Sequence, residues 1–179
     1  MAKIITLINE QEIQKKVKEL AIAISNDNKN STPLLVGILK GAWVFMADLV
    51  RNLTVPVNID FLQVSSYGKA TESSGIVKIV TDLKFSIEGR NVILVEDIVD
   101  SGLTLKYIID YLTIRRPNNV KICSLLDKPA RHKIEIKVDY LGFEVPNKFV
   151  VGYGIDYQEL YRNLPYIAYV ETDDEKQSI

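Results

Sequence analysis

The sequence is poor in the residues that form disulfides and zinc sites. Of its 179 residues, one is cysteine (Cys123) and one is histidine (His132). A single cysteine excludes an intrachain disulfide, so a reducing cytoplasm is the simplest location. A structural zinc site needs roughly four ligands, mostly Cys and His, so these two residues do not support one. We expect Cys123 in the core, and His132 at the surface without a catalytic role.

Long apolar runs and an excess of one charge are also absent. No run approaches the roughly 20 apolar residues of a membrane span, and the first ten residues lack the apolar stretch of a secretory signal. The 22 basic and 23 acidic residues give a net charge of −1, which argues against nucleic acid held on a broad basic face. With 47% hydrophobic residues, the chain is expected to form one domain over residues 1–179, with no membrane or nucleic-acid partner.

Apolar spacing predicts an alternation of helices and strands. Asn9 and Glu12 have the spacing of a capping box, and apolar residues then recur at helical spacing over about 10–26. Two more helices are predicted over 42–53 and around 105–112, and strands over 33–39, 57–66, 77–83, 91–97, 120–128 and 138–145. This order is typical of an α/β fold with a doubly wound, mostly parallel sheet flanked by helices.

Polar residues stand at the ends of three predicted strands. Lys40 follows the strand 33–39, the acids Glu96 and Asp97 end the strand 91–97, and Lys128 ends the strand 120–128. Because ligands bind at the carboxyl ends of the strands in such sheets, these side chains are expected to line one crevice.

The stretch VILVEDIVDSGLTL, residues 92–105, places three acids within five positions. Carboxylates so close repel one another and resist desolvation, so a cation or a hydroxyl-rich ligand is expected between them. The segment from Asp100 to Thr104 lies between a strand and a helix. Its N–H groups and the hydroxyls of Ser101 and Thr104 suit a phosphate, which Gly102 would let come close. From the turn alone, a simpler alternative is that Asp100 or Ser101 only caps the helix.

This stretch resembles the phosphoribosyl pyrophosphate (PRPP) signature of the type I phosphoribosyltransferases. The resemblance implies that Glu96 and Asp97 hold the 2′- and 3′-hydroxyls of the ribose. It further implies that the next turn holds the 5′-phosphate through Asp100, Ser101, Gly102, Leu103 and Thr104.

Three other segments resemble the hypoxanthine-guanine members of that family: LLVGILKGAWVFMADL, SSYG and KPARHKIEIKVDYLGFEVPNKFVVGYGIDYQELYRNLPY. The similarity runs in register from about Leu35 to Tyr166. It implies transfer of the 5-phosphoribosyl group from PRPP to N9 of hypoxanthine or guanine, giving IMP or GMP and pyrophosphate, with Mg²⁺ as cofactor. It also implies a homodimer or homotetramer, and a small hood over the sheet formed by about residues 1–10 and 140–170.

The resemblance assigns the rest of the site. Asp100 would be the catalytic base that takes the proton from purine N7. Pyrophosphate would be held by Lys40, Gly41 and Arg162, where the peptide entering Lys40 can be cis. The purine would be held by Lys128, Lys148, Phe149 and Val150. Glu96 and Asp97 would bind Mg²⁺, and Asp156 would bind a second Mg²⁺ on the pyrophosphate. Ser66 and Tyr67 would begin a mobile loop over residues 66–75.

Two of these roles also follow from the side chains themselves. Phe149 offers a face on which a base can stack. Lys148 only donates hydrogen bonds, so it suits the O6 acceptor of a 6-oxopurine and not the amino group of adenine. Trp43, at the start of the second predicted helix, is expected in packing or in a subunit interface.

Two other functions use the same residues. A PRPP-binding regulatory protein of the same fold would need an added nucleic-acid-binding surface, which the near-neutral charge does not favour. A receiver or hydrolase domain with Asp97 and Asp100 as a metal pair leaves KFVVGYGIDY unexplained.

Overall fold

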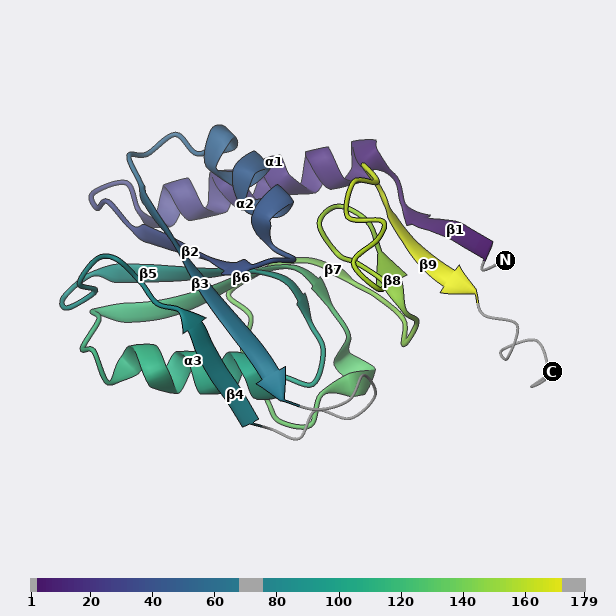
Figure 1. Cartoon of the computed structure of the whole chain (residues 1–179). Coiled ribbons are helices and arrows are strands. Elements are labelled where there is room, and N and C mark those ends of the chain that lie inside the picture. The colour runs from purple at the N-terminus through teal and green to yellow at the C-terminus, as the bar shows by residue number, and fades with distance from the viewer. Residues whose placement is uncertain (1–2, 68–75, 172–179) are drawn as a thin grey trace.

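The computed structural model describes residues 3–67 and 76–171 (Figure 1). Its elements, in chain order, are β1 (Lys3–Ile8), α1 (Glu10–Asp27), β2 (Leu34–Leu39), α2 (Trp43–Asn52), β3 (Asn58–Tyr67), β4 (Ile76–Thr81), β5 (Asn91–Val99), α3 (Leu103–Thr113), β6 (Asn119–Asp127), a 3₁₀ turn (Pro129–Arg131), β7 (Tyr140–Glu144), β8 (Val150–Val151) and β9 (Ile167–Glu171).

The main sheet has the strand order β4-β3-β2-β5-β6-β7. Only β4 runs antiparallel to its neighbour, so the prediction of a mostly parallel sheet is confirmed. The chain passes from β2 to β3 on one side and from β5 to β6 on the other. The strand order therefore reverses between β2 and β5, which is the point where open α/β sheets bind ligands.

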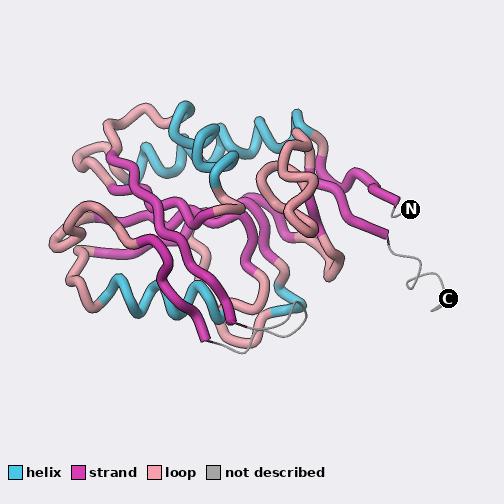
Figure 2. The backbone as a smooth tube through the Cα atoms, viewed as in Figure 1, coloured by secondary structure: helices cyan, strands magenta, loops and turns pink. Residues whose placement is uncertain are grey.

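Helices cover both faces of this sheet, with α1 and α2 on one face and α3 on the other (Figures 1 and 2). Alternate residues of each central strand supply the two cores, as the period of a strand requires. Leu35 and Val95 pack in the cluster that contains α1 and α2, whereas Leu34 and Leu94 pack in the cluster that contains α3.

Local signals in the sequence explain where α1 begins and which side it buries. The side chain of Asn9 accepts from the N–H of Glu12, and the Glu12 carboxylate accepts from the N–H of Asn9, both at 2.9 Å. This confirms the capping box. The buried residues of α1 include Ile13, Val17 and Ile24, at helical spacing, which confirms the helix predicted over 10–26.

A second sheet, of order β1-β9-β8, joins the N-terminal segment to the C-terminal part of the chain. Figure 2 shows these strands beyond one end of the main sheet. None of the three was predicted as a strand. The hood was expected to include residues 140–144, but these form β7 and pair with β6 in the main sheet, because the carboxyl half of β6 offers them a free parallel edge.

Two further predictions concern the loop and the membrane. Ser66 and Tyr67 lie at the end of β3, so the strand takes the first two positions of the predicted loop, and residues 68–75 lie outside the described part of the chain. Within residues 3–67 and 76–171, no helix has the length and apolar character that crossing a membrane requires.

Candidate active site

The acid pair lies within β5, just before the last two residues of the strand, and not after its end. The strand was predicted to finish at Asp97, but it runs on to Val99 because it keeps pairing with β6, through Ile98 with Leu126 and Val99 with Asp127. Glu96 and Asp97 are therefore held on a rigid strand at the carboxyl edge of the sheet.

The surroundings of this pair are unfavourable for two negative charges. Oε2 of Glu96 is buried and has no hydrogen-bond partner among the described residues. Burial, and then the neighbouring Asp97 carboxylate, raise the pKa of Glu96 well above its ordinary value, and burial also raises the pKa of Asp97. A buried polar atom without a partner destabilises the free protein, which is the expected sign of a ligand-binding group.

The segment after β2 contacts the same acids. A Cβ atom at Gly41 would lie 1.7 Å from Oδ2 of Asp97, so only glycine lets this backbone pass so close to the carboxylate. The Leu39–Lys40 peptide is cis. The structure thus brings the backbone of Gly41 to Asp97, because β2 and β5 are neighbouring parallel strands that end at the same edge of the sheet.

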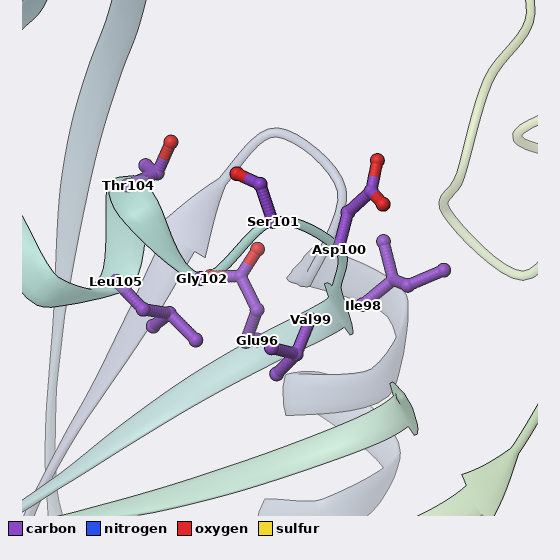
Figure 3. A pocket seen from close by; sticks show the side chains of 8 residues that line it. All are labelled: Glu96, Ile98, Val99, Asp100, Ser101, Gly102, Thr104 and Leu105. Atoms are coloured by element: carbon purple, nitrogen blue, oxygen red, sulfur yellow. The ribbon is translucent and has the colours of Figure 1, made fainter. Parts of the chain in front are cut away.

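A cavity of about 140 Å³ lies at the turn between β5 and α3. Figure 3 shows the Asp100, Ser101 and Thr104 side chains extending from this turn, with Glu96 beside it. The cavity is lined by Glu96, Ile98, Val99, Asp100, Ser101, Gly102, Thr104 and Leu105. All but one of the residues predicted to bind the sugar phosphate after Asp97 line this cavity; the exception is Leu103.

The start of α3 excludes the simpler explanation of this turn. The helix begins at Leu103 with Gly102 as its N-cap, and no side chain caps it. Neither Asp100 nor Ser101 is therefore the N-cap residue. Oγ of Ser101 accepts a long hydrogen bond, 3.4 Å, from the N–H of Leu103, a contact that an anion could replace at this helix N-terminus. Gly102 has φ +81°, and a Cβ there would lie 2.9 Å from Ile136, so a larger residue would be both strained and crowded.

Asp100 lies close to cationic side chains. Its Oδ1 accepts from Nε of Arg131 at 3.0 Å. Lys128 follows β6 and is 8% exposed. Burial lowers the pKa of Lys128, while the negative charge of Asp100 acts in the opposite direction. The structure thus places Lys128 beside Asp100, as the strand-end argument predicted.

The turn from Gly152 to Arg162 carries Asp156 and Arg162, which the sequence predicted to bind metal and pyrophosphate. Arg162 donates to the Gly154 carbonyl through Nη1 at 2.8 Å and lies 2.7 Å from Oδ1 of Asp156 through Nη2. A Cβ at Gly154 would lie 2.2 Å from the carbonyl oxygen of Gly41. The turn that carries Asp156 and Arg162 therefore rests directly on the loop that carries Gly41.

One carboxylate links the cations on this side. Oε2 of Glu159 lies 3.0 Å from Nζ of Lys40 and 3.4 Å from Nη2 of Arg162. Lys40 is exposed and so is Glu159, hence a polyanionic ligand could replace this contact at small cost.

Apart from Lys128, the residues predicted to hold the purine lie beside β8 and β9. Phe149 is 53% exposed and contacts Tyr157 edge to face, with ring centroids 5.1 Å apart, so one face of its ring is open to a base. Val150 is the first residue of β8. Nζ of Lys148 lies 3.8 Å from the ring centroid of Tyr169, and this cation–π contact fixes the lysine, a contact that the sequence analysis did not predict.

The donor set suits Mg²⁺ better than a metal held by protein alone. Among the described residues, no group of three or more His, Cys, Asp and Glu side chains is arranged to hold a metal ion. Mg²⁺ commonly takes one or two carboxylates and completes its shell with water and substrate phosphate oxygens. The unpartnered Oε2 of Glu96 and the adjacent Asp97 fit such a shared ion.

Several contacts at the site were not predicted. Arg131 and Asp100 are 31 positions apart, and Lys40 and Glu159 are 119 positions apart, so no local pattern relates either pair. The surface position expected for His132 is met only in part. Its Nε2 lies 2.6 Å from Oδ1 of the buried Asp127, and its side chain is 20% exposed, because the 3₁₀ turn after β6 folds it back onto the strand end.

Comparisons with known proteins agree with this geometry. Residues 6–158 match the family described as phosphoribosyl transferase domain. The hypoxanthine-guanine phosphoribosyltransferase of Bacillus subtilis is 54% identical over 162 residues, 90% of each chain. The enzyme of that name from Aquifex aeolicus is 51% identical over 166 residues, covering 92% of this chain and 93% of the relative.

Solved structures show the same fold. A crystal structure of a hypoxanthine-guanine phosphoribosyltransferase from Bacillus anthracis, with a HEPES molecule in its active site, superposes with a TM-score of 0.89. It is 49% identical, and the match covers 93% of this chain and 98% of that one. A hypoxanthine phosphoribosyltransferase structure from Staphylococcus aureus gives the same TM-score at 46% identity, covering 93% and 90% of the two chains.

A sugar-phosphate turn, an acid pair at the strand-order reversal and a match over most of the chain define the class: the chain belongs to the phosphoribosyltransferase family. Within that family, its relatives place it with the hypoxanthine-guanine phosphoribosyltransferases.

Proposed function

We propose that this protein transfers the 5-phosphoribosyl group of PRPP to N9 of hypoxanthine or guanine, releasing pyrophosphate and forming IMP or GMP. The observation that carries the proposal is the buried Oε2 of Glu96, which has no partner among the described residues and lies beside Asp97, between the turn at the start of α3 and the Gly41 loop. Ribose hydroxyls are donors and match these carboxylates, which only accept when ionised. The relatives support purine salvage and give no support to the regulatory alternative.

The groups on the two sides of the acid pair would bind different parts of PRPP. On one side, the amides before and within the first turn of α3, with the Ser101 and Thr104 hydroxyls, would hold the 5′-phosphate. On the other side, Lys40, the Gly41 amide and Arg162 would hold pyrophosphate, for which the forked guanidinium of Arg162 is well shaped. Lys40 and Arg162 would exchange the Glu159 carboxylate for phosphate oxygens.

One Mg²⁺ would be held by Glu96 and Asp97 and a second by Asp156, each with substrate oxygens and water, and both would supply neutralising charge to the pyrophosphate. The protein's own part is electrostatic and positional. As the C1–pyrophosphate bond breaks, positive charge develops on the ribose, and Lys40 and Arg162 stabilise the negative charge on the departing group.

Asp100 is proposed as the general base. Purine N9 forms the new bond to ribose C1, and the proton on N7 passes to the Asp100 carboxylate. Arg131 occupies Oδ1 of that carboxylate, so Oδ2 would take the proton. Nearby, Phe149 would stack on the base, the Val150 backbone would meet its edge, and Lys148 or Lys128 would donate to O6.

The test is a spectrophotometric assay with PRPP, Mg²⁺ and each of hypoxanthine, guanine, xanthine and adenine. We expect turnover of hypoxanthine and guanine and little or none of adenine, because a buried polar site built for one donor–acceptor pattern can reject its opposite by about 10⁴–10⁵. Turnover of adenine above that of the 6-oxopurines would contradict the assignment.

We also propose that the protein is cytoplasmic and assembles as a homodimer or homotetramer. The free cysteine is buried and unreactive in the core, which fits a reducing compartment. Trp43 is 49% exposed at the start of α2, which suits a subunit interface. Light scattering on the purified chain tests the assembly, and a monomeric mass would contradict it.

A further inference from the structure

A buried hydrogen bond lies directly behind the pyrophosphate side of the site. The hydroxyl of Tyr153 donates to Oδ2 of Asp48 at 2.5 Å, and the two residues are 3% and 8% exposed. Oδ2 of Asp48 also accepts from Nε2 of Gln14 at 3.1 Å, and Oδ1 is paired with Arg51. A buried carboxylate with this many donors is held in one position.

Tyr153 belongs to the turn that carries the pyrophosphate-binding side chains. Its N–H donates to the Leu164 carbonyl at 2.8 Å, and the next residue, Gly154, donates to the Arg162 carbonyl at 2.9 Å. Arg162 returns a side-chain hydrogen bond to Gly154. The backbone from Tyr153 to Leu164 is therefore one connected unit that includes Asp156 and Arg162.

Asp48 belongs to the helix that follows the other half of the pyrophosphate side. Helix α2 begins at Trp43, immediately after Lys40, Gly41 and Ala42. Where the two segments meet, the Gly154 backbone touches the Gly41 carbonyl so closely that no side chain fits between them. The Tyr153–Asp48 bond joins the Gly152–Arg162 turn to α2 through buried side chains, whereas the Lys40–Glu159 contact between the two segments is exposed.

We propose that Asp48 and Tyr153 are positioning residues for pyrophosphate, which hold the turn carrying Asp156 and Arg162 against the loop carrying Lys40 and Gly41. Neither residue lines the sugar-phosphate cavity, and neither is proposed to touch the purine. Removing this hydrogen bond should therefore lower the affinity for the pyrophosphate group and leave the affinity for the purine base unchanged. The inference rests on the proposed function, because it names which substrate group the link serves.

The chain offers a matched control. The hydroxyl of Tyr140 donates to Oδ2 of Asp27 at 2.7 Å, with Lys121 also bound to that carboxylate. Tyr140 is buried like Tyr153, but it lies on the edge strand β7, two strands away from the acid pair of β5, and its hydroxyl contacts the end of α1 at Asp27. Tyr140→Phe therefore removes the same kind of bond without reaching the substrates.

The experiment compares Tyr153→Phe, Asp48→Asn and Tyr140→Phe with the unaltered protein. Steady-state kinetics are measured in both directions, and binding of pyrophosphate with Mg²⁺ is measured by calorimetry. We expect Tyr153→Phe to raise the KM for PRPP and for pyrophosphate about tenfold, since hydrogen bonds to charged groups are strong. The KM for hypoxanthine should change less than twofold. Asp48→Asn still accepts from Tyr153, so its KM values for PRPP and pyrophosphate should lie between those of the unaltered protein and those of Tyr153→Phe. Tyr140→Phe should lower only the melting temperature.

Equal thermal destabilisation by the two Tyr→Phe changes, with unchanged pyrophosphate binding and KM in Tyr153→Phe, would overturn the proposal and leave a purely structural bond. The binding arm separates this failure from failure of the proposed function. If the unaltered protein binds pyrophosphate but does not turn over PRPP, the proposed function is wrong. A tenfold loss of pyrophosphate affinity in Tyr153→Phe would then still support the positioning role. If it does not bind pyrophosphate at all, both proposals are overturned.

Discussion

The backbone of Gly41 lies against the carboxylate of Asp97, so closely that a methyl group at position 41 would come within 1.7 Å of Oδ2. Gly41→Ala must therefore displace the Asp97 side chain or move the loop. Because near-attack geometry tolerates little displacement, we expect this change to lower kcat/KM for PRPP at least tenfold while the protein stays folded.

The control for this change is Gly89→Ala. A Cβ placed at Gly89 would have no atom within 4 Å, but the φ of +68° makes a residue other than glycine mildly strained there. It should lower stability by about 1 kcal/mol and leave kcat/KM unaltered. Full activity in Gly41→Ala would show that the contact with Asp97 does not matter to the site.

Asp100→Asn tests the general base. The amide keeps the shape of the carboxylate and one acceptor for Arg131, but it cannot take a proton from N7. General base catalysis typically contributes about 10²–10⁴-fold, so kcat should fall by that order while PRPP affinity changes much less. Asp110→Asn, which alters an exposed acid on α3 paired with Lys106, is the control. Unchanged turnover in Asp100→Asn would remove Asp100 from this role.

Two lysines compete for the purine O6 contact, and their variants distinguish them. Lys148 is held over the Tyr169 ring at 3.8 Å, whereas Lys128 is buried near Asp100. If Lys148 reads O6, Lys148→Met should raise the KM for hypoxanthine about tenfold or more and reduce its preference over adenine. Kinetics with both bases would measure this ratio. A ratio that is preserved in Lys148→Met and lost in Lys128→Met would transfer the role to Lys128.

The buried carboxylate of Asp48 predicts a loss of stability in acid. Burial acts to raise its pKa, but hydrogen bonds from Tyr153, Gln14 and Arg51 outweigh this and lower the pKa from its ordinary value of 3.8. An acid with a lowered pKa in the folded state contributes stability that is present above the unfolded value and is lost as pH falls through the folded value.

Melting temperatures recorded from about pH 5 down to about pH 2 should therefore fall more steeply for the unaltered protein than for Asp48→Asn. The variant should already be less stable at neutral pH. Parallel curves would show that the hydrogen bonds to Asp48 do not favour its ionised form.

Features with a local signal could be predicted from the sequence. The capping box at Asn9 and the apolar faces of α1 and α3 involve residues within a turn or two of each other, and the parallel sheet follows from strand–helix alternation. The acid pair and the following turn were visible because they occupy consecutive positions from Glu96 to Thr104.

Features that depend on distant contacts could not be predicted. β8 is two residues long, and β1 pairs with β9, which lies near the other end of the described chain. None of these three strands therefore has a local sequence pattern that would predict it. The same is true of Tyr153 with Asp48, and of Lys148 with Tyr169. Strand β5 also runs past its predicted end because β6 extends alongside it. Ile98 and Val99 are β-branched and favour a strand, but two residues after an acid pair do not show whether the pairing continues.

Calorimetric titration of the folded protein with PRPP at saturating Mg²⁺ tests the central claim most directly, because the acids at positions 96 and 97 are assigned to the metal-loaded sugar. We predict saturable binding at one site per chain, abolished or strongly weakened when Glu96→Gln and Asp97→Asn are combined. Absence of binding to the unaltered protein, or undiminished binding to the double variant, would contradict the account.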